Sequence, residues 1–393
     1  MRMASLFPWR LRRLRILTLL SLLTVLLVAA PQALASEYLL YVGTYTGKGS
    51  EGIYAYRFDP AAGETRSVGL VAATENPSFL AVDPNGRFLY AVNELDTFRN
   101  EPTGALSVFA VDRQSGKLKL LQQVSSLGAG PAHVSLDKSA RYLMVANYNG
   151  GNVAAFPIGN DGRLGRHSAF VQHVGSSVNP DRQTGPHAHS IQVTNDNRFV
   201  LAADLGLDRL LVYRFDAGTG SLTPGSPKFV EVDPGAGPRH VAFAPSGKFV
   251  YVVNEMTSTV TVFAYNPAAG TLHRVQTVPT LPKDFTGKNT AAEIAVDAKG
   301  RFLYVSNRGN DTIAVFGIDQ DNGSLESPEW VPSGGKTPRN FVIDPTGHWL
   351  FAANQDSNNI ELLRIDERSG RLAPTNRSLK VVSPVCALFV PFH

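Results

Sequence analysis

Apolar and polar residues alternate along most of the chain, and the alternation returns in units of about 50 residues. Each unit contains an alternating apolar run, a polar turn with Gly or Asn, and a second apolar run. The six copies are PSFLAVDPNGRFLYAVNE (77–94), PAHVSLDKSARYLMVANY (131–148), AHSIQVTNDNRFVLAADL (188–205), PRHVAFAPSGKFVYVVNE (238–255), AEIAVDAKGRFLYVSNR (292–308) and PRNFVIDPTGHWLFAANQ (338–355). This pattern predicts six β-hairpins.

A third alternating segment follows each hairpin, for example GALSVFAVD (104–112) and STVTVFAYN (258–266). A short turn then leads to a fourth strand, as in RQSGKLKLLQQV (113–124). Four strands in every unit of this length are typical of one blade of a β-propeller.

The two ends of the chain indicate how many blades there are. EYLLYVGTY (37–45) and EGIYAYRFD (51–59) match a second and a third strand, whereas PVCALFV (384–390) matches a first strand. The ends therefore complete one blade between them. We predict an all-β, seven-bladed β-propeller over residues 36–393, with four antiparallel strands per blade, whose closure removes exposed sheet edges. The alternative, two stacked β-sandwiches, would not need ends that complement each other.

Residues 1–35 have the pattern of a secretory signal peptide. Five arginines precede the uncharged apolar run ILTLLSLLTVLLVAA (16–30), and Ala33-Leu34-Ala35 offers a cleavage site before Ser36. The sequence thus predicts a periplasmic or secreted protein that is free of the membrane after cleavage. The alternative is a signal anchor that is never cut, although the apolar run is shorter than a typical span of about 20 residues.

The leader also accounts for most of the basic character of the chain. Without its five arginines, the 37 basic residues become 32, against 33 acidic residues. The mature chain therefore offers no basic patch for nucleic acid. Its single cysteine, Cys386, lies in an apolar run, which predicts a buried thiol and excludes an internal disulfide.

Two sets of polar residues stand at the same end of the predicted hairpins, because the second strand of each returns to where the first begins. At the starts of first strands lie His133, His187, His189, Arg239, His240, Glu293, Arg339 and Asn340. At the ends of second strands lie Asn93-Glu94, Asn147, Asp204, Asn254-Glu255, Asn307-Arg308 and Asn354-Gln355. The recurring Asn predicts a turn or a hydrogen bond between blades. The residues that break the repeat instead predict an anion-binding or acid–base site at the central channel.

The motifs YVGTYT, GPHAHSI, GPRHVAFAPSGKFVYVVNE and AEIAVDAKGRFLYVSNR together resemble the lactonase family of seven-bladed propellers. That family includes propeller-type 6-phosphogluconolactonases and carboxymuconate cyclases. The resemblance covers the chain from Glu37 onward and implies a lactone hydrolase or a cycloisomerase. It implies His189 (or His187), Arg239, Glu255 and Arg308 as catalytic residues, with His240 and Glu293 adjacent to them. Together with His133, His187 and Arg339, which also stand at the starts of first strands, His240 and Glu293 are expected to bind the substrate.

Those residue types suit the opening of a lactone ring by water. A carboxylate or an imidazole can accept the proton of the water, while arginine or histidine stabilises the developing oxyanion. We expect Glu255 to be the general base or to orient a histidine base, with His189 as the competing base. No G-x-S-x-G elbow and no metal-ligand spacing is present, so we expect neither a covalent serine, a metal nor another cofactor.

The sequence leaves the substrate open. An export signal does not suit a phosphorylated cytoplasmic metabolite, so an unphosphorylated sugar lactone is an alternative to 6-phosphogluconolactone. A carboxymuconate-type cycloisomerase and a non-catalytic exported binding module also remain as alternatives, since fold does not fix function. The protein is expected to be a monomer whose partner is a small-molecule lactone.

Overall fold

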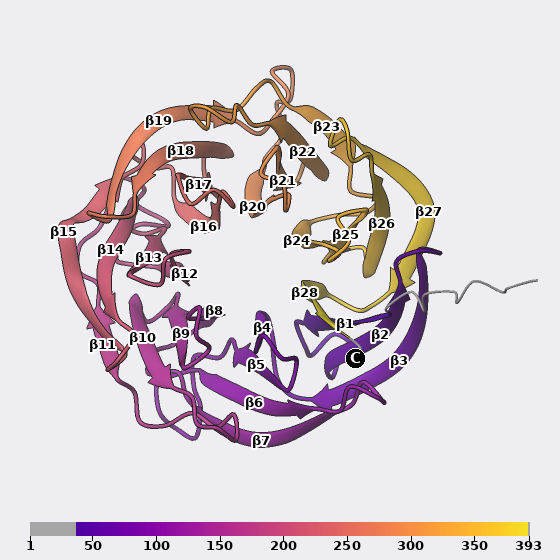
Figure 1. The fold of residues 1–393 in the computed structure, drawn as a ribbon, viewed down its shortest axis with the longest axis horizontal. Coiled ribbons are helices and arrows are strands. Elements are labelled where there is room, and N and C mark those ends of the chain that lie inside the picture. Colours follow the sequence, from indigo (N-terminus) through magenta and orange to yellow (C-terminus); the bar gives the residue numbers. More distant parts are fainter. Residues whose placement is uncertain (1–36, 392–393) are drawn as a thin grey trace, which may run out of the picture. The chain divides into compact units, whose positions relative to one another are not determined.

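The computed structural model describes residues 37–391, so the predicted leader lies outside the described residues. The described chain forms seven four-stranded antiparallel sheets around a central channel (Figure 1). β-Strands are the regular elements of this part of the chain, and no helix occurs between residues 37 and 391. Correspondingly, this part of the chain has no helix that is long and apolar enough to cross a membrane. The predicted all-β, seven-bladed fold is confirmed.

Six blades are each built from four consecutive strands, and the first strand of each lies nearest the channel. These strands are β4 (Leu80–Val82), β5 (Phe88–Asn93), β6 (Ala105–Val111) and β7 (Leu118–Ser125); β8 (Pro131–Leu136), β9 (Tyr142–Asn147), β10 (Asn152–Pro157) and β11 (Ala169–Gln172); β12 (Ala188–Val193), β13 (Phe199–Asp204), β14 (Arg209–Asp216) and β15 (Ser221–Glu231); β16 (Pro238–Phe243), β17 (Phe249–Asn254), β18 (Thr259–Asn266) and β19 (Thr271–Pro279); β20 (Thr290–Val296), β21 (Phe302–Arg308), β22 (Thr312–Gly317) and β23 (Glu329–Pro332); β24 (Pro338–Ile343), β25 (Trp349–Asn354), β26 (Asn359–Ile365) and β27 (Leu372–Lys380).

The seventh blade joins the two ends of the described chain, as predicted. Its inner strand is the C-terminal β28 (Pro384–Pro391), followed outward by β1 (Tyr38–Thr44), β2 (Gly52–Asp59) and β3 (Glu64–Ala73). β28 pairs antiparallel with β1, with Ala387 opposite Val42. Cys386 is buried on this strand, and burial raises the pKa of its thiol to about 12. The expected buried thiol is therefore confirmed.

The apolar side chains form seven clusters, one between each pair of neighbouring blades. Successive residues of a strand point to opposite faces of its sheet, so each strand contributes to the cores on both sides. In β17, for example, Tyr251 packs toward the blade of β20 and Val252 toward the blade of β12. Because both faces of a blade are buried, successive residues of a strand must pack alternately against the two neighbouring blades.

The repeated asparagine at the end of the second strand links neighbouring blades. The side-chain amides of Asn147, Asn307 and Asn354 each donate a hydrogen bond of 2.9 Å to the carbonyl that follows the outer strand of the preceding blade. The acceptors are Ser126, Thr280 and Ser333, respectively. The predicted blade-to-blade role is thereby confirmed for these three residues, whereas Asn254 donates to Thr259 and Thr261 of its own blade. The non-repeating residues beside the Asn positions are left for the channel.

Candidate active site

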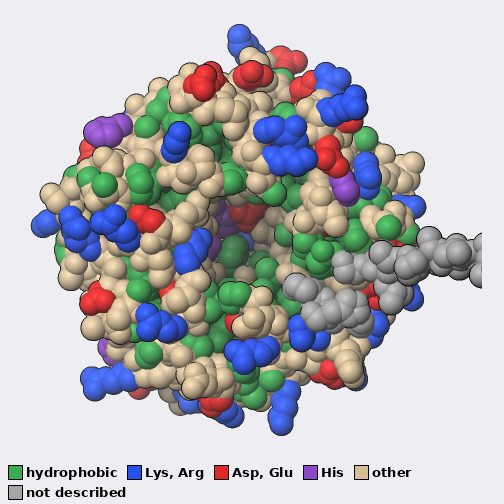
Figure 2. Space-filling view, viewed as in Figure 1, with side chains coloured by type: hydrophobic (Ala, Val, Ile, Leu, Met, Phe, Trp, Pro, Cys, Tyr) green, Lys and Arg blue, Asp and Glu red, His purple; other side chains and the backbone are tan. Residues whose placement is uncertain are grey.

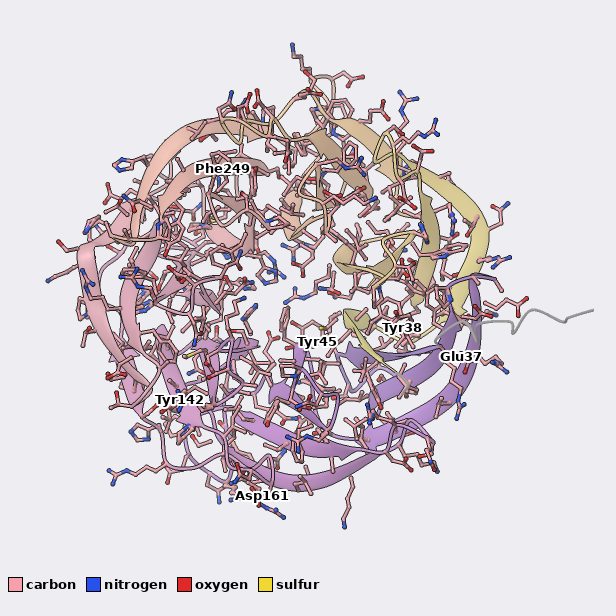
Figure 3. The ribbon with its side chains drawn as sticks, viewed as in Figure 1. Glu37, Tyr38, Tyr45, Tyr142, Asp161 and Phe249 are labelled. Carbon is pink, nitrogen blue, oxygen red and sulfur yellow. The ribbon has the colours of Figure 1, made fainter. Side chains whose placement is uncertain are left out.

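Side chains from several blades converge on one cavity of about 370 Å³ at an end of the channel. Figure 2 shows the hollowed centre of the ring, and Figure 3 shows Tyr45 at the channel whereas Tyr142 and Phe249 lie within the blades. The size is within the range of small-molecule sites. The lining residues are Tyr45, Glu94, Ala132, Tyr148, Arg182, His189, Arg239, Glu255, Thr290, Arg308 and Arg339.

Irregular strand pairing determines the direction in which four of these side chains point. In β8, β12, β16 and β24 the pairing with the second strand skips one residue near the start of the inner strand. The skipped residues are Ala132, His189, Arg239 and Arg339, and all four line the cavity. A bulge of this kind redirects a side chain out of the regular in–out alternation. It therefore frees these positions from the packing between blades and turns them to the channel.

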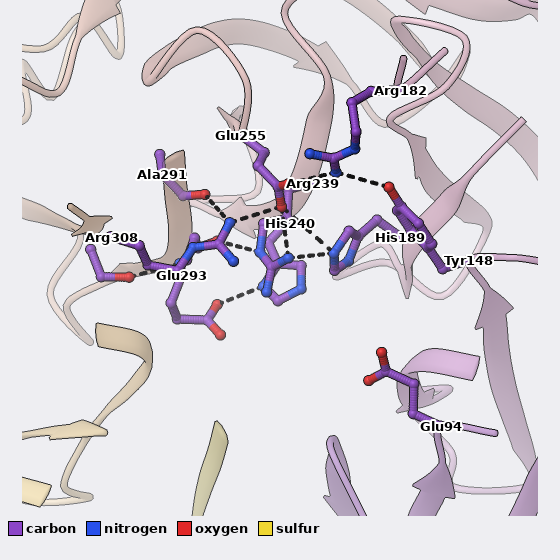
Figure 4. A network of polar contacts seen from close by, with 12 residues as sticks. Glu94, Tyr148, Arg182, His189, Arg239, His240, Glu255, Ala291, Glu293 and Arg308 are labelled. Atoms are coloured by element: carbon purple, nitrogen blue, oxygen red, sulfur yellow. Dashed lines mark hydrogen bonds and ion pairs between the residues drawn. The ribbon is translucent and has the colours of Figure 1, made fainter. Parts of the chain in front are cut away.

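Glu255 is the centre of an arginine cluster (Figure 4). Its Oε2 lies 2.9 Å from Nη1 of Arg239 and 2.9 Å from Nη2 of Arg308, and its Oε1 accepts a hydrogen bond of 2.9 Å from Nη2 of Arg182. Arg239 and Arg308 are anchored in turn by the carbonyls of Ala292 and Ala291, each at 3.1 Å. Both carboxylate oxygens are thus engaged by guanidinium groups.

The cluster is buried but stays ionised. Burial alone would raise the pKa of Glu255, but Arg308 and Arg239 outweigh it and hold that pKa well below its usual range. Burial, together with repulsion from Arg239, lowers the pKa of Arg308 to about 9, so this guanidinium is still charged at neutral pH. Glu255 therefore acts as the shared counter-ion of three arginines.

His189 is held against the same cluster as a neutral imidazole. Its Nε2 contacts Nη1 of Arg239, and guanidinium can only donate, so Nε2 must be the acceptor and the ring proton resides on Nδ1. Burial and the charge of Arg239 keep the pKa of His189 well below its usual value. The lone pair of its Nε2 is consequently occupied.

A second layer of side chains lies beside the lining, where the ring of His240 is 5.2 Å from that of His189. His240 donates from Nδ1 to Glu293 at 3.0 Å, and Glu293 also accepts from the amide of Asn340. The ring of His133 lies 4.3 Å from that of Phe79 and 5.5 Å from that of His240. Burial lowers the pKa of both histidines. No side chain of this second layer is among those that line the cavity.

The wall opposite the arginine cluster contains Glu94, which Figure 4 shows with its carboxylate directed toward the cluster. Tyr45 donates its hydroxyl to both oxygens of Glu94, at 3.0 and 2.9 Å, and Ser78 donates to Oε2. Arg339 lies over the Tyr45 ring, 5.1 Å from its centroid. Burial raises the pKa of Tyr45, so the phenol keeps the proton that it donates.

The candidate residues are thus placed as follows. All four expected catalytic residues line the cavity, where Arg239 contacts His189 and Glu255 and Arg308 contacts Glu255, and Arg339 lines it as well. His133, His240 and Glu293 lie in the second layer, while His187 stacks on Tyr148 at 4.5 Å beside the cavity. Substrate contact by these four therefore stays a prediction.

Sequence reasoning did not select Tyr45, Glu94, Tyr148 or Arg182. A signal was present for two of them, because Glu94 and Tyr148 follow the repeated Asn just as Glu255 and Arg308 do. Arg182 lies in the segment between β11 and β12, which has no counterpart in the repeat, and it reaches Glu255 and the hydroxyl of Tyr148, each at 2.9 Å.

The lining has an excess of positive charge. It contains four arginines and two glutamates, so two guanidinium charges lack a carboxylate in the lining. Arginine binds carboxylate and phosphate groups through paired hydrogen bonds. The cavity thus favours an anionic ligand or one that becomes anionic. No three His, Cys, Asp or Glu side chains lie close enough together to hold a metal ion within residues 37–391.

The buried histidines predict that stability falls in mild acid. The pKa values of His133, His189 and His240 are lowered in the folded protein, so below about pH 6.5 the unfolded chain binds protons that the folded chain does not. This contribution to stability is complete above that pH and is lost as the pH falls. Unfolding takes up at most three protons, so the free energy of unfolding falls by at most about 4 kcal/mol per pH unit. Urea titrations between pH 7.5 and 5.0 measure this slope.

His133→Leu provides the matched control, because the ring of His133 packs against Phe79 and its burial is nearly complete. The variant should take up about one proton fewer on unfolding. Equal urea midpoints at pH 7.5 and 5.5 for the unaltered protein would contradict the prediction. Glu255, whose pKa is depressed, adds a separate loss only below its usual pKa of about 4.5.

Comparison with known proteins gives a consistent result. The sequence profile of a family described as "Lactonase, 7-bladed beta-propeller" matches residues 39–389. A 6-phosphogluconolactonase of Bacillus subtilis is 38% identical over 306 residues, which cover 78% of this chain and 85% of the relative. A 6-phosphogluconolactonase of Formosa agariphila is 32% identical over 306 residues, covering 77% and 85% of the two chains.

A solved structure is similar over nearly the whole described ring. The periplasmic gluconolactonase of Pseudomonas aeruginosa is 37% identical, with a TM-score of 0.85. The match covers 91% of this chain and all of the other.

Proposed function

This chain belongs to the lactonase family of seven-bladed β-propellers, and on that premise we propose that it hydrolyses a sugar lactone in the channel cavity. The observation that carries the proposal is the convergence of Arg239, Arg308, His189 and Glu255 on one cavity with an excess of positive charge. Hydrolysis converts a neutral ester into a carboxylate, and the charge develops on the carbonyl oxygen on the way. A cationic cavity stabilises both the transition state and the product.

The arginine cluster is suited to the carbonyl end of the lactone. The contacts of Arg239 with Glu255, His189 and Ala292 use only part of its five N–H donors, so others are left for a ligand. We assign Arg239 and Arg308 to the oxyanion. Arg182 and Arg339 lie on the same lining and are available for an anionic substituent of the substrate.

Neither role expected for Glu255, general base or orientation of a histidine base, fits the geometry as well as orientation of the arginines. Three guanidinium groups occupy its two oxygens, and its low pKa makes it a poor proton acceptor. Glu255 instead fixes Arg182, Arg239 and Arg308 in place and cancels part of their repulsion. Preorganised charge of this kind is a large source of catalysis.

The location and the exact lactone are proposed from the N-terminal sequence and the relatives. Residues 1–35 have the pattern of an export signal, and the similar Pseudomonas aeruginosa protein is a periplasmic gluconolactonase. We therefore favour an aldonolactone outside the cytoplasm. Two other relatives are 6-phosphogluconolactonases, so the phosphorylated lactone belongs in the same test.

The test is acid release, followed in a pH-stat, from gluconolactone, its 6-phosphate and a carboxymuconolactone. We expect hydrolysis well above the spontaneous rate for at least one sugar lactone. Arg239→Ala should lower kcat/KM about 10²–10³-fold, because it removes a donor to the oxyanion.

Two outcomes would change the assignment. Activity confined to the carboxymuconolactone would favour a cycloisomerase. Equal rates for the unaltered protein, for Arg239→Ala and for buffer alone would favour a binding module and contradict a lactonase.

A further inference from the structure

Hydrolysis needs a proton acceptor for the attacking water, and the cavity offers few. The titratable groups on its lining, other than arginines, are Glu94, Glu255, His189, Tyr45 and Tyr148. The contacts of each decide whether it has a free lone pair and can accept a proton.

Four of these groups are already engaged. Glu255 has both oxygens on guanidinium groups, and the Nε2 lone pair of His189 receives Arg239. Tyr45 is a protonated donor, because burial raises its pKa. The hydroxyl of Tyr148 accepts a hydrogen bond of 2.9 Å from Arg182.

Glu94 differs in the kind of partner that it has. Its hydrogen bonds come from two neutral hydroxyls, those of Tyr45 and Ser78, rather than from a guanidinium group. Oε2 accepts both hydroxyls, whereas Oε1 accepts only that of Tyr45, at 3.0 Å. A carboxylate oxygen has two lone-pair sites, so Oε1 keeps one.

The position of Glu94 also suits a base. Its carboxylate lies across the cavity from Arg239 and Arg308 and is directed toward them (Figure 4). A lactone whose carbonyl oxygen faces the arginines would present its carbonyl carbon to a water near Glu94. Tyr45 and Ser78 fix the rotamer of Glu94, as a base that acts on one water requires.

We infer that Glu94 is the general base of the reaction, an inference that rests on the proposed lactonase function. The water oxygen forms a bond to the carbonyl carbon as its proton passes to Oε1 of Glu94, and the C=O π pair moves onto the oxygen held by the arginines. When that pair returns, the ring C–O bond breaks and the proton on Glu94 passes to the departing ring oxygen. The hydroxy acid then releases one proton to solvent, and Glu94 is again a carboxylate.

Two substitutions at Glu94 test this role. Glu94→Ala removes the base and leaves a space beside the cavity, so kcat should fall about 10²-fold or more while KM changes less than about threefold. An excess of formate should fill that space and restore kcat at least tenfold. Glu94→Gln should lose as much activity without rescue, because the amide fills the same space and cannot accept the proton.

The matched control is Glu255→Ala, whose loss formate should not restore, because a small anion does not rebuild a three-arginine network. Urea midpoints and binding of gluconate verify that the Glu94 variants fold and keep the arginine cluster. If Glu94→Ala retains more than a third of kcat, or if formate fails to rescue it, Glu94 is not the base, although the protein is still a lactonase. If the unaltered protein hydrolyses no lactone, the proposed function itself fails.

Discussion

Replacing Glu255 with alanine should lower kcat/KM at least 10³-fold and cost about 3–5 kcal/mol of folding free energy. The side chain is 6% exposed and is the shared counter-ion of Arg182, Arg239 and Arg308. Without it, the three guanidinium groups repel one another and lose the geometry that the oxyanion needs. Steady-state kinetics and urea unfolding measure the two effects.

Two further glutamate variants separate charge from shape. Glu255→Gln keeps the size of the side chain and one acceptor oxygen, so it should lose most of the activity but less stability than the alanine variant. Glu231→Gln removes a carboxylate that is 61% exposed and lies 3.1 Å from Arg209 on an outer strand. It should change stability by less than about 1 kcal/mol and leave activity unaltered. Near-normal activity in Glu255→Ala would contradict the proposed role of the cluster.

Removal of the last strand should prevent folding. Deletion of residues 384–393 takes away β28, which forms the inner strand of the closing blade, and leaves the edge of β1 unpaired. The strand buries Val385, Ala387, Phe389 and Val390. Their burial is worth about 5–10 kcal/mol, comparable with the whole stability of a typical domain. We expect the truncated chain to accumulate in the insoluble fraction.

In the full-length chain, labelling of Cys386 measures how often β28 detaches from β1. The Cys386 thiol is buried on β28 with a pKa of about 12, so a thiol reagent at pH 8 should label it only after β28 detaches. Ala387→Asp places a charge at a buried position of the strand and should speed labelling at least tenfold. Equal labelling rates in both proteins, or a soluble and folded truncated chain, would contradict the importance of this strand.

The fold could be predicted because each blade repeats one pattern and because two buried faces demand strict alternation. Residues 37–45 and 384–390 even predicted the closing blade, since a second strand without a first must find its partner elsewhere in the chain. The repeated Asn was assigned correctly at positions 147, 307 and 354 for the same reason, namely that a residue found in nearly every blade serves the scaffold.

The site could be predicted only where the repeat breaks. Glu255, Arg239 and His189 stand out because most of their counterparts differ, and the structure brings them into contact. Glu94 occupies the same relative position as Glu255, but sequence alone does not reveal that its partners are hydroxyls. Arg182 lies outside the repeat, so its contact with Glu255 depends on the path of a long connection.

The skipped residues of β8, β12, β16 and β24 have a consequence for how such a protein can diversify. Because these positions face the channel and lie outside the apolar clusters between blades, a change there alters the lining without removing an apolar contact of the core. Ala132 already stands as a small residue where the other three strands present His189, Arg239 and Arg339. The same seven-blade frame can thus be adapted to new ring-shaped esters by exchanging a handful of side chains, provided that the buried charges of the lining stay paired.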